Sequence, residues 1–134
     1  GVGQERCLRL AYARAGIDPA EIGLLECHAT GTTVGDATEI TSAARVFGQR
    51  GRLPIGSLKS NLGHLITAAG GAGLLKVLSA MEHGVLPPTR IEGDENPVLA
   101  DTPFRVLRTP EPWSVPPGKP RLAAVSAFGF GGNN

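Results

Sequence analysis

Three short stretches of the chain combine glycine with side chains that can hold or donate a proton. They are residues 27–32 (CHATGT), 59–64 (KSNLGH) and 128–133 (FGFGGN). Glycine allows a backbone to approach a ligand closely, and well-placed donors stabilise negative charge that develops on an oxygen. His28 and His64 are therefore candidate donors to an oxyanion, although a single histidine beside a strand is more often structural.

Each of these stretches follows a short apolar run that predicts a buried strand. The runs span residues 22–28, 55–58 and 122–128, and a fourth strand is expected at 104–107, within a proline-rich region. Ligand sites in open α/β sheets form at the carboxyl ends of the strands. The three polar stretches therefore stand where an α/β protein places its chemistry.

Helical patterns separate the strands. Residues 4–15 carry apolar side chains at helical spacing, and Gly16 supplies a C-terminal stop. Asp36, with Glu39 three residues later, predicts the capped start of a helix that runs to about Phe47. Residues 64–82 are almost wholly apolar and predict a buried central helix. The order α-β-α-β-α-β-β indicates an α/β fold.

The composition fits one domain and excludes several classes of protein. The chain has 134 residues, of which 41% are hydrophobic and 19% charged, so a buried core is feasible. Because 13 Lys and Arg nearly cancel 12 Asp and Glu, no basic field favours nucleic acid. No apolar run approaches the ~20 residues of a membrane span. Two cysteines do not make a disulfide scaffold.

The order and spacing of three motifs resemble the β-ketoacyl synthase family, and most closely the ketosynthase domains of type I polyketide synthases. The motifs are LECHATGT at 25–32 with Gly35, Asp36 and Glu39 behind it, SLKSNLGHL at 57–65, and VSAFGFGGNN at 125–134. This resemblance implies a thiolase-like α/β fold. Residues 1–134 are then the C-terminal half of its αβαβα sandwich. The half that carries the nucleophilic cysteine is absent, so we expect a segment of a longer protein.

The resemblance also implies a reaction, the decarboxylative Claisen condensation of a carrier-bound malonyl unit with an acyl thioester. His28 and His64 would polarise the malonyl thioester and stabilise its enolate, and Lys59 would orient the histidines. Further residues are expected to assist: Phe130 in the oxyanion hole and as a gate to the acyl tunnel, Thr30 and Thr32 on the pantetheine arm, and Asn61, Gly129 and Gly131 in loop support. No cofactor is expected to bind directly, because phosphopantetheine of the acyl carrier protein carries the substrate.

The expected partners follow from the same resemblance. They are the N-terminal ketosynthase half, acyl carrier protein, and a second copy of the full domain in a homodimer, with no nucleic acid and no membrane. The segment alone is expected to be inactive, and its apolar stretch at 64–82 is expected to need a partner. A cytoplasmic location is expected, because the sequence shows no export signal and the carrier-protein system is intracellular.

Three other interpretations compete with a condensing enzyme. A non-condensing, ketosynthase-like module or chain-length factor would hold acyl chains without joining them, and the residue at the upstream cysteine position would distinguish it. Cys27 as nucleophile is disfavoured, because on a strand it would point away from His28. A metal site of His28, His64, His83 and a cysteine has no supporting C-x-x-C or H-x-x-x-H spacing.

Overall fold

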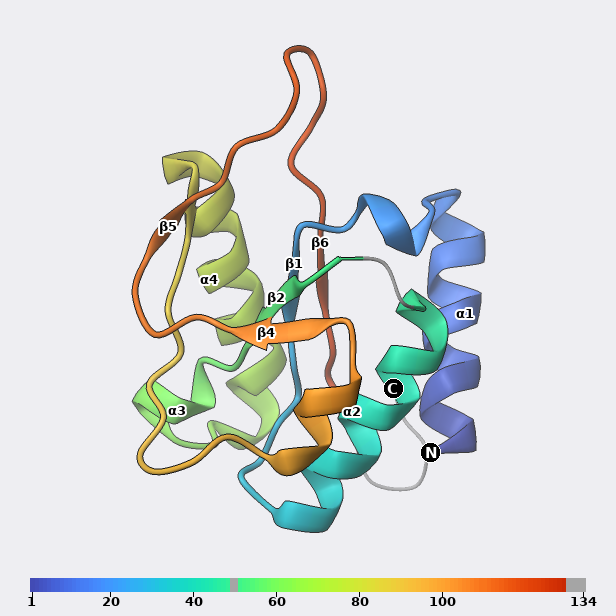
Figure 1. Ribbon diagram of the computed structural model, residues 1–134, viewed down its shortest axis with the longest axis vertical. Helices are drawn as coiled ribbons and strands as arrows, with labels where there is room; N and C mark the ends of the chain where they lie inside the picture. Colours follow the sequence, from blue (N-terminus) through green and yellow to red (C-terminus); the bar gives the residue numbers. More distant parts are fainter. Residues whose placement is uncertain (49–50, 130–134) are drawn as a thin grey trace.

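The computed structural model describes residues 1–48 and 51–129, which form three layers. A four-stranded sheet lies in the middle (Figure 1), with α1 (Val2–Ala15) and α2 (Thr33–Phe47) on one face and α4 (Ala69–His83) on the other. The α/β class predicted from the sequence is confirmed, and the parallel strands reflect the crossover helices between them.

The sheet has the strand order β4-β2-β1-β6, and all its pairings are parallel. Its strands are β1 (Leu24–Glu26), β2 (Leu53–Gly56), β4 (Phe104–Val106) and β6 (Ala123–Val125). Leu25 of the central strand lies opposite Ile55 on one side and Ala124 on the other. The carboxyl ends of β1, β2 and β6 therefore lie side by side, and the loops that follow them meet at one edge.

Shorter elements complete the described chain. They are the 3₁₀ turns η1 (Pro19–Glu21), η2 (Ile66–Ala68) and η3 (Pro97–Asp101), the single-turn helix α3 (Lys59–Leu62), and a small antiparallel pair of β3 (Val85–Leu86) with β5 (Glu111–Pro112). Helix α1 ends at Gly16, as predicted, because this residue adopts the left-handed conformation (φ 64°) that glycine tolerates.

Successive side chains of β1 pack into two separate hydrophobic clusters, one on each face of the sheet. Leu25 and Cys27 pack in the cluster beneath α1 and α2. Leu24 packs in the cluster beneath α4, beside Val77 and Ala80. Since side chains alternate across a strand, Glu26 continues the face that looks toward α4, where it meets Gly73 and Lys76.

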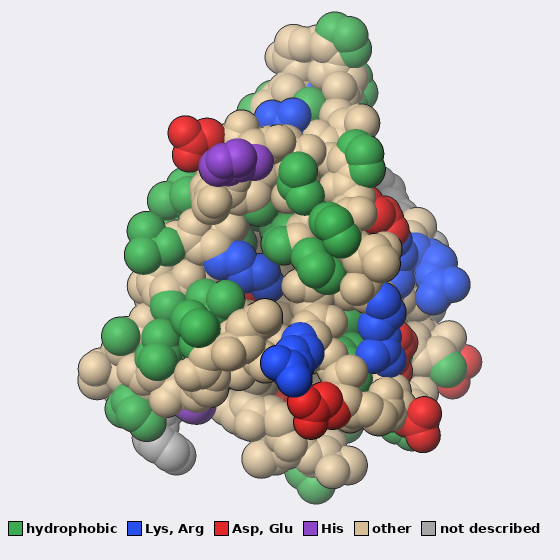
Figure 2. Space-filling model, turned by 90° about the vertical axis from the view of Figure 1, so that its left-hand side faces the viewer, with side chains coloured by type: hydrophobic (Ala, Val, Ile, Leu, Met, Phe, Trp, Pro, Cys, Tyr) green, Lys and Arg blue, Asp and Glu red, His purple; other side chains and the backbone are tan. Residues whose placement is uncertain are grey.

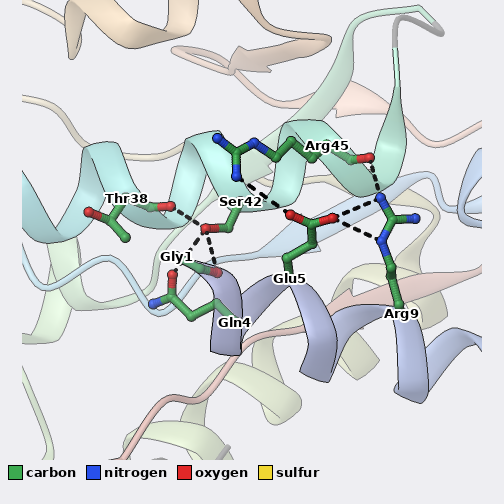
Figure 3. A network of polar contacts seen from close by, with 7 residues as sticks. All are labelled: Gly1, Gln4, Glu5, Arg9, Thr38, Ser42 and Arg45. Carbon is green, nitrogen blue, oxygen red and sulfur yellow. Dashed lines mark hydrogen bonds and ion pairs between the residues drawn. The ribbon is translucent and has the colours of Figure 1, made fainter.

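Polar contacts join α1 and α2 where the two helices pack against each other (Figure 3). Glu5 forms ion pairs with Arg9 at 3.0 Å and with Arg45 at 3.6 Å. The Ser42 hydroxyl donates to the Thr38 carbonyl at 2.7 Å and lies within 3.4 Å of Gln4 Oε1. These contacts involve none of the three polar loops. Charged residues in them can therefore be replaced as controls for charged residues nearer the histidines.

Two sequence predictions about helices were wrong in detail. Helix α2 starts at Thr33 with Thr32 as its N-cap, four residues before the expected cap Asp36, so Glu39 lies well inside the helix. The apolar stretch at 64–82 is helical only from Ala69, because η2 precedes α4. That helix is also only half buried within this chain. No helix in the described part of the chain is long and apolar enough to cross a membrane.

Candidate active site

His28 and His64 come together although 35 residues separate them in the sequence. His28 follows β1, and His64 follows α3 after the end of β2. Their ring centroids lie 5.7 Å apart, with the ring planes at 83°. The Phe128 ring, beyond β6, packs edge-on against His28 at 5.7 Å. The three strand ends therefore deliver one residue each to a single aromatic cluster.

Backbone N–H groups fix the tautomer of both imidazoles. The N–H of Ile66 donates to Nδ1 of His64 at 2.9 Å, and the N–H of Phe128 donates to Nδ1 of His28 at 3.4 Å. A ring nitrogen that accepts a hydrogen bond carries no proton, so the proton of each neutral ring lies on Nε2. Each histidine consequently offers one N–H donor from its far nitrogen.

Ile66 adopts a positive φ of 52° while it makes this contact. That conformation is rare for a β-branched side chain and costs on the order of 1–3 kcal/mol. Strain of this kind persists where the surrounding structure fixes the backbone. Here the strained residue is the one whose N–H holds His64 Nδ1.

The surroundings of His28 favour its neutral form. Burial lowers its pKa below the usual value, and the positive charge of Lys59 and the neighbouring His64 lower it further. Asp36 acts in the opposite direction but more weakly. The neutral imidazole is therefore the favoured form of His28, and in that form the ring can donate one hydrogen bond.

A buried carboxylate holds the loop that carries His28. Glu39 of α2 accepts the N–H of His28 at 2.7 Å through one oxygen and the N–H of Ala29 at 2.8 Å through the other. Ala29 has a positive φ of 22°, which these two bonds enforce. Burial raises the pKa of Glu39, although the two backbone bonds oppose the rise. The sequence prediction of a helix-capping Glu39 was wrong, since the carboxylate binds a loop ten residues earlier.

Lys59, Thr30 and Thr32 line a pocket of about 650 Å³ beside the histidines. Neither His28 nor His64 lines that pocket, which extends toward residues 89–97. Among residues 1–48 and 51–129, Lys59 makes no ion pair. Its positive charge is one of the causes that lower the pKa of His28. The predicted pantetheine-binding threonines are thus exposed and next to Lys59.

The remaining predicted residues are less central. Asn61 is exposed, and its Oδ1 accepts a hydrogen bond from the Ser60 hydroxyl at 3.1 Å. Gly129 is the last residue that the structure describes, one position beyond Phe128. Phe130 and Gly131, predicted for the oxyanion hole and its loop, lie outside the described residues.

Cys27 has the properties of a core residue. Its side chain is 7% exposed and packs in the core cluster beneath α2. Burial raises the pKa of the Cys27 thiol well above its usual value, and the carboxylates of Glu39 and Glu26 raise it further. A thiol held neutral in this way is a poor nucleophile.

Metal-binding geometry is not found in the described residues, where no three His, Cys, Asp or Glu side chains gather around one point. His83 ends α4, whereas His64 precedes that helix. The Nδ1 of His83 lies 2.9 Å from the Ser79 carbonyl in its own helix. The three histidines therefore do not form one site.

Fold and site together define a class: a parallel α/β unit that presents, at the carboxyl edge of its sheet, two histidines whose Nδ1 atoms each accept a backbone N–H. The family model described as "Beta-ketoacyl synthase, C-terminal domain" matches residues 1–91. The chain belongs to the β-ketoacyl synthase family.

Curated relatives match nearly the whole length of this chain. One is a component of the polyunsaturated fatty acid synthase of Thraustochytrium sp., 45% identical over 144 residues, covering 98% of this chain and 5% of the relative. The highly reducing polyketide synthase xilA of Penicillium rubens is 45% identical over 143 residues, covering 100% of this chain and 6% of the relative. The chain thus spans about one-twentieth of the length of these relatives.

Solved structures confirm the thiolase-like ketosynthase fold. The ketosynthase from module 6 of the bacillaene synthase of Bacillus subtilis 168 superimposes with a TM-score of 0.88 at 39% identity, covering 95% of this chain and 24% of that chain. An oxazolomycin ketosynthase domain from Streptomyces albus JA3453 gives 0.85 at 44% identity, covering 94% of this chain and 24% of that one. The chain corresponds to about a quarter of each solved ketosynthase.

Proposed function

We propose that this chain supplies the malonyl-activating half of a β-ketoacyl synthase. The observation that carries the proposal is the pair of histidines whose Nδ1 atoms accept backbone N–H groups, while neither Nε2 makes a hydrogen bond to residues 1–48 or 51–129. Two such donors suit a thioester oxygen that becomes an enolate oxygen, because both hydrogen bonds strengthen as the negative charge develops.

In the proposed reaction, the bond between the malonyl carboxylate and Cα breaks, and carbon dioxide leaves. The electron pair moves to the thioester oxygen, which His28 and His64 stabilise through Nε2–H. The enolate carbon then attacks the acyl thioester, a carbon–carbon bond forms, and the cysteine leaves as its thiolate. That cysteine belongs to the N-terminal half of the ketosynthase, which is the first partner we propose.

The exposed face of α4 supports this partner. Leu74, Leu75 and Leu78 are 49%, 69% and 51% exposed, and hydrophobic side chains gather on the flank of the molecule that α3 and α4 form (Figure 2). A patch of this kind marks a protein interface. The N-terminal half would cover it and bring the cysteine to the histidines. Acyl carrier protein would present the malonyl unit on its pantetheine arm beside Thr30 and Thr32.

The test is malonyl decarboxylation by the complete ketosynthase domain that contains this segment, with malonyl-acyl carrier protein as substrate. His28→Ala and His64→Ala should each lower the decarboxylation rate about 100- to 1,000-fold, the usual effect of losing one oxyanion donor. His83→Ala is the matched control, since it removes an exposed histidine at the far end of α4, and it should retain the wild-type rate.

A non-condensing module predicts a different outcome. Such a protein would bind acyl-carrier substrates, but wild type and His28→Ala would show the same background decarboxylation. Equal rates in these two proteins would refute the condensing function. Retention of both histidines and their donors is the feature that favours the condensing enzyme over this alternative.

A further inference from the structure

A second buried carboxylate, at the end of the strand that leads to His28, has no place in the reaction described above. Glu26, at the end of β1, is 3% exposed, and its Oε2 forms an ion pair with Nζ of Lys76 at 2.6 Å. The Lys76 side chain is 11% exposed and belongs to α4. The two residues are 50 positions apart, so the pair joins the central strand to the helix that covers it.

The other oxygen of the same carboxylate holds the start of the second histidine loop. Oε1 of Glu26 accepts the N–H of Leu58 at 2.6 Å. Leu58 immediately precedes Lys59, and α4 follows His64 through η2. One carboxylate is thus bonded on both sides of the segment that carries Lys59 and His64.

Glu26 is the last residue of β1, two positions before His28, so the strand end that it anchors leads directly into the loop that carries His28. Residues two apart along a strand point to the same side, and Leu24, two positions before Glu26, packs beneath α4. Gly73 of α4 passes close to the Glu26 side chain, since a Cβ on Gly73 would lie 3.2 Å from Glu26 Cγ. The strand that positions His28 and the loop that positions His64 therefore share one buried anchor.

The energetics point away from a purely stabilising role. Removing two charges from water is costly, and apolar replacements of buried pairs are often neutral or stabilising. The pair is better explained by the geometry it imposes, because both carboxylate oxygens reach defined donors on two different elements.

We propose that the Glu26–Lys76 pair is a positioning device that sets the separation of the His28 and His64 donors for the enolate. This inference rests on the proposed condensing function, because it concerns the transition state of malonyl decarboxylation. Glu26 and Lys76 touch neither substrate nor the reacting atoms, so they are positioning residues.

The experiment uses the complete ketosynthase domain and separates its two half-reactions. The amount of acyl-enzyme formed at the nucleophilic cysteine measures how many molecules are folded and able to accept an acyl group. Malonyl decarboxylation reports the histidine pair. Glu26→Gln places an amide N–H against the Lys76 ammonium, and Lys76→Met removes the charge while keeping most of the aliphatic side chain. Each variant should lower the kcat of decarboxylation at least tenfold, with the number of acylated sites and the KM for malonyl-carrier little changed.

Two further variants sharpen the result. Lys76→Arg keeps the charge and should recover most of the decarboxylation lost in Lys76→Met. Glu5→Gln is the matched control, because it removes a carboxylate from the ion pairs between α1 and α2 (Figure 3) and should leave both half-reactions unchanged.

The outcomes distinguish this inference from the proposed function. Wild-type decarboxylation in both Glu26→Gln and Lys76→Met, while His28→Ala is inactive, would overturn the positioning role and leave the proposed function standing. A proportional loss of acylation and decarboxylation, or failure of both variants to fold, would assign the pair to folding and would also overturn it. An unaffected His28→Ala variant would instead refute the proposed function.

Discussion

Replacement of Gly73 by alanine tests whether the close contact between α4 and Glu26 matters. The new Cβ would lie 3.2 Å from Glu26 Cγ, 3.6 Å from Glu26 Oε1 and 3.7 Å from Val125 Cγ1. The optimal separation of carbon atoms is about 3.5–4.0 Å. The side chain of Glu26 must therefore move by a few tenths of an ångström, and its bond to the Leu58 N–H moves with it.

Two opposing effects set the magnitude for Gly73→Ala. Alanine stabilises a helix interior by about 1 kcal/mol relative to glycine, whereas overpacking a buried site costs about 1–3 kcal/mol. The free energy of unfolding should accordingly stay the same or fall by up to about 2 kcal/mol. A misplacement of ~1 Å can cost about 100-fold in rate. For a shift of a few tenths of an ångström, we therefore expect decarboxylation to be roughly three- to tenfold slower.

The assay compares denaturant unfolding and malonyl decarboxylation in the same preparations of the complete domain. Gly3→Ala in α1 is the control, since a Cβ there would meet nothing within 4 Å. It should leave the rate unchanged and should not destabilise the protein. If Gly73→Ala matched Gly3→Ala in both stability and rate, the reasoning about the Glu26 contact would be refuted.

Two other predictions follow from the charges and the packing. Lys59→Ala removes a positive charge that lowers the pKa of His28, so that pKa should rise and the acid-side loss of decarboxylation should begin at a higher pH. Lys119→Ala, on an exposed turn, should leave the pH profile in place, and an unmoved acid limb in Lys59→Ala would contradict the assignment. Gly23→Ala should destabilise the protein by about 1–3 kcal/mol. The Cβ of the new alanine would lie 2.6 Å from Nε1 of Trp113, and Trp113 is only 4% exposed. Urea unfolding measures this loss, and unchanged stability would show that the Trp113 pocket can relax.

Local signals in the sequence were sufficient to predict the sheet and the meeting of two histidine-containing loops at one of its edges. Apolar runs bounded by turns located β1, β2, β4 and β6 to within a few residues. Two histidines in glycine-containing loops after neighbouring strands were expected at one edge, and their rings are 5.7 Å apart. Parallel pairing of β1 with both β2 and β6 is what brings the loops together.

The positioning contacts could not be predicted, because they depend on tertiary approach. Glu39 had the spacing of a helix cap, yet its partners are the N–H groups of His28 and Ala29. Glu26 stood in an apolar run, and nothing in the sequence paired it with Lys76, 50 residues away. The exposure of α4, by contrast, was expected from the apolar stretch at 64–82, and Leu74, Leu75 and Leu78 of that helix are about half exposed or more.

The central claim is that His28 and His64 act as neutral donors through Nε2–H, and ¹⁵N NMR of labelled histidines in the complete domain tests it most directly. At pH 7 the account predicts that both rings carry their proton on Nε2, with His28 remaining neutral below the usual pH range of a histidine. His83 is the internal reference, because its Nδ1 faces a carbonyl and must carry a proton. A proton on Nδ1 of His28 or His64, or an imidazolium at His28 at pH 7, would contradict the account.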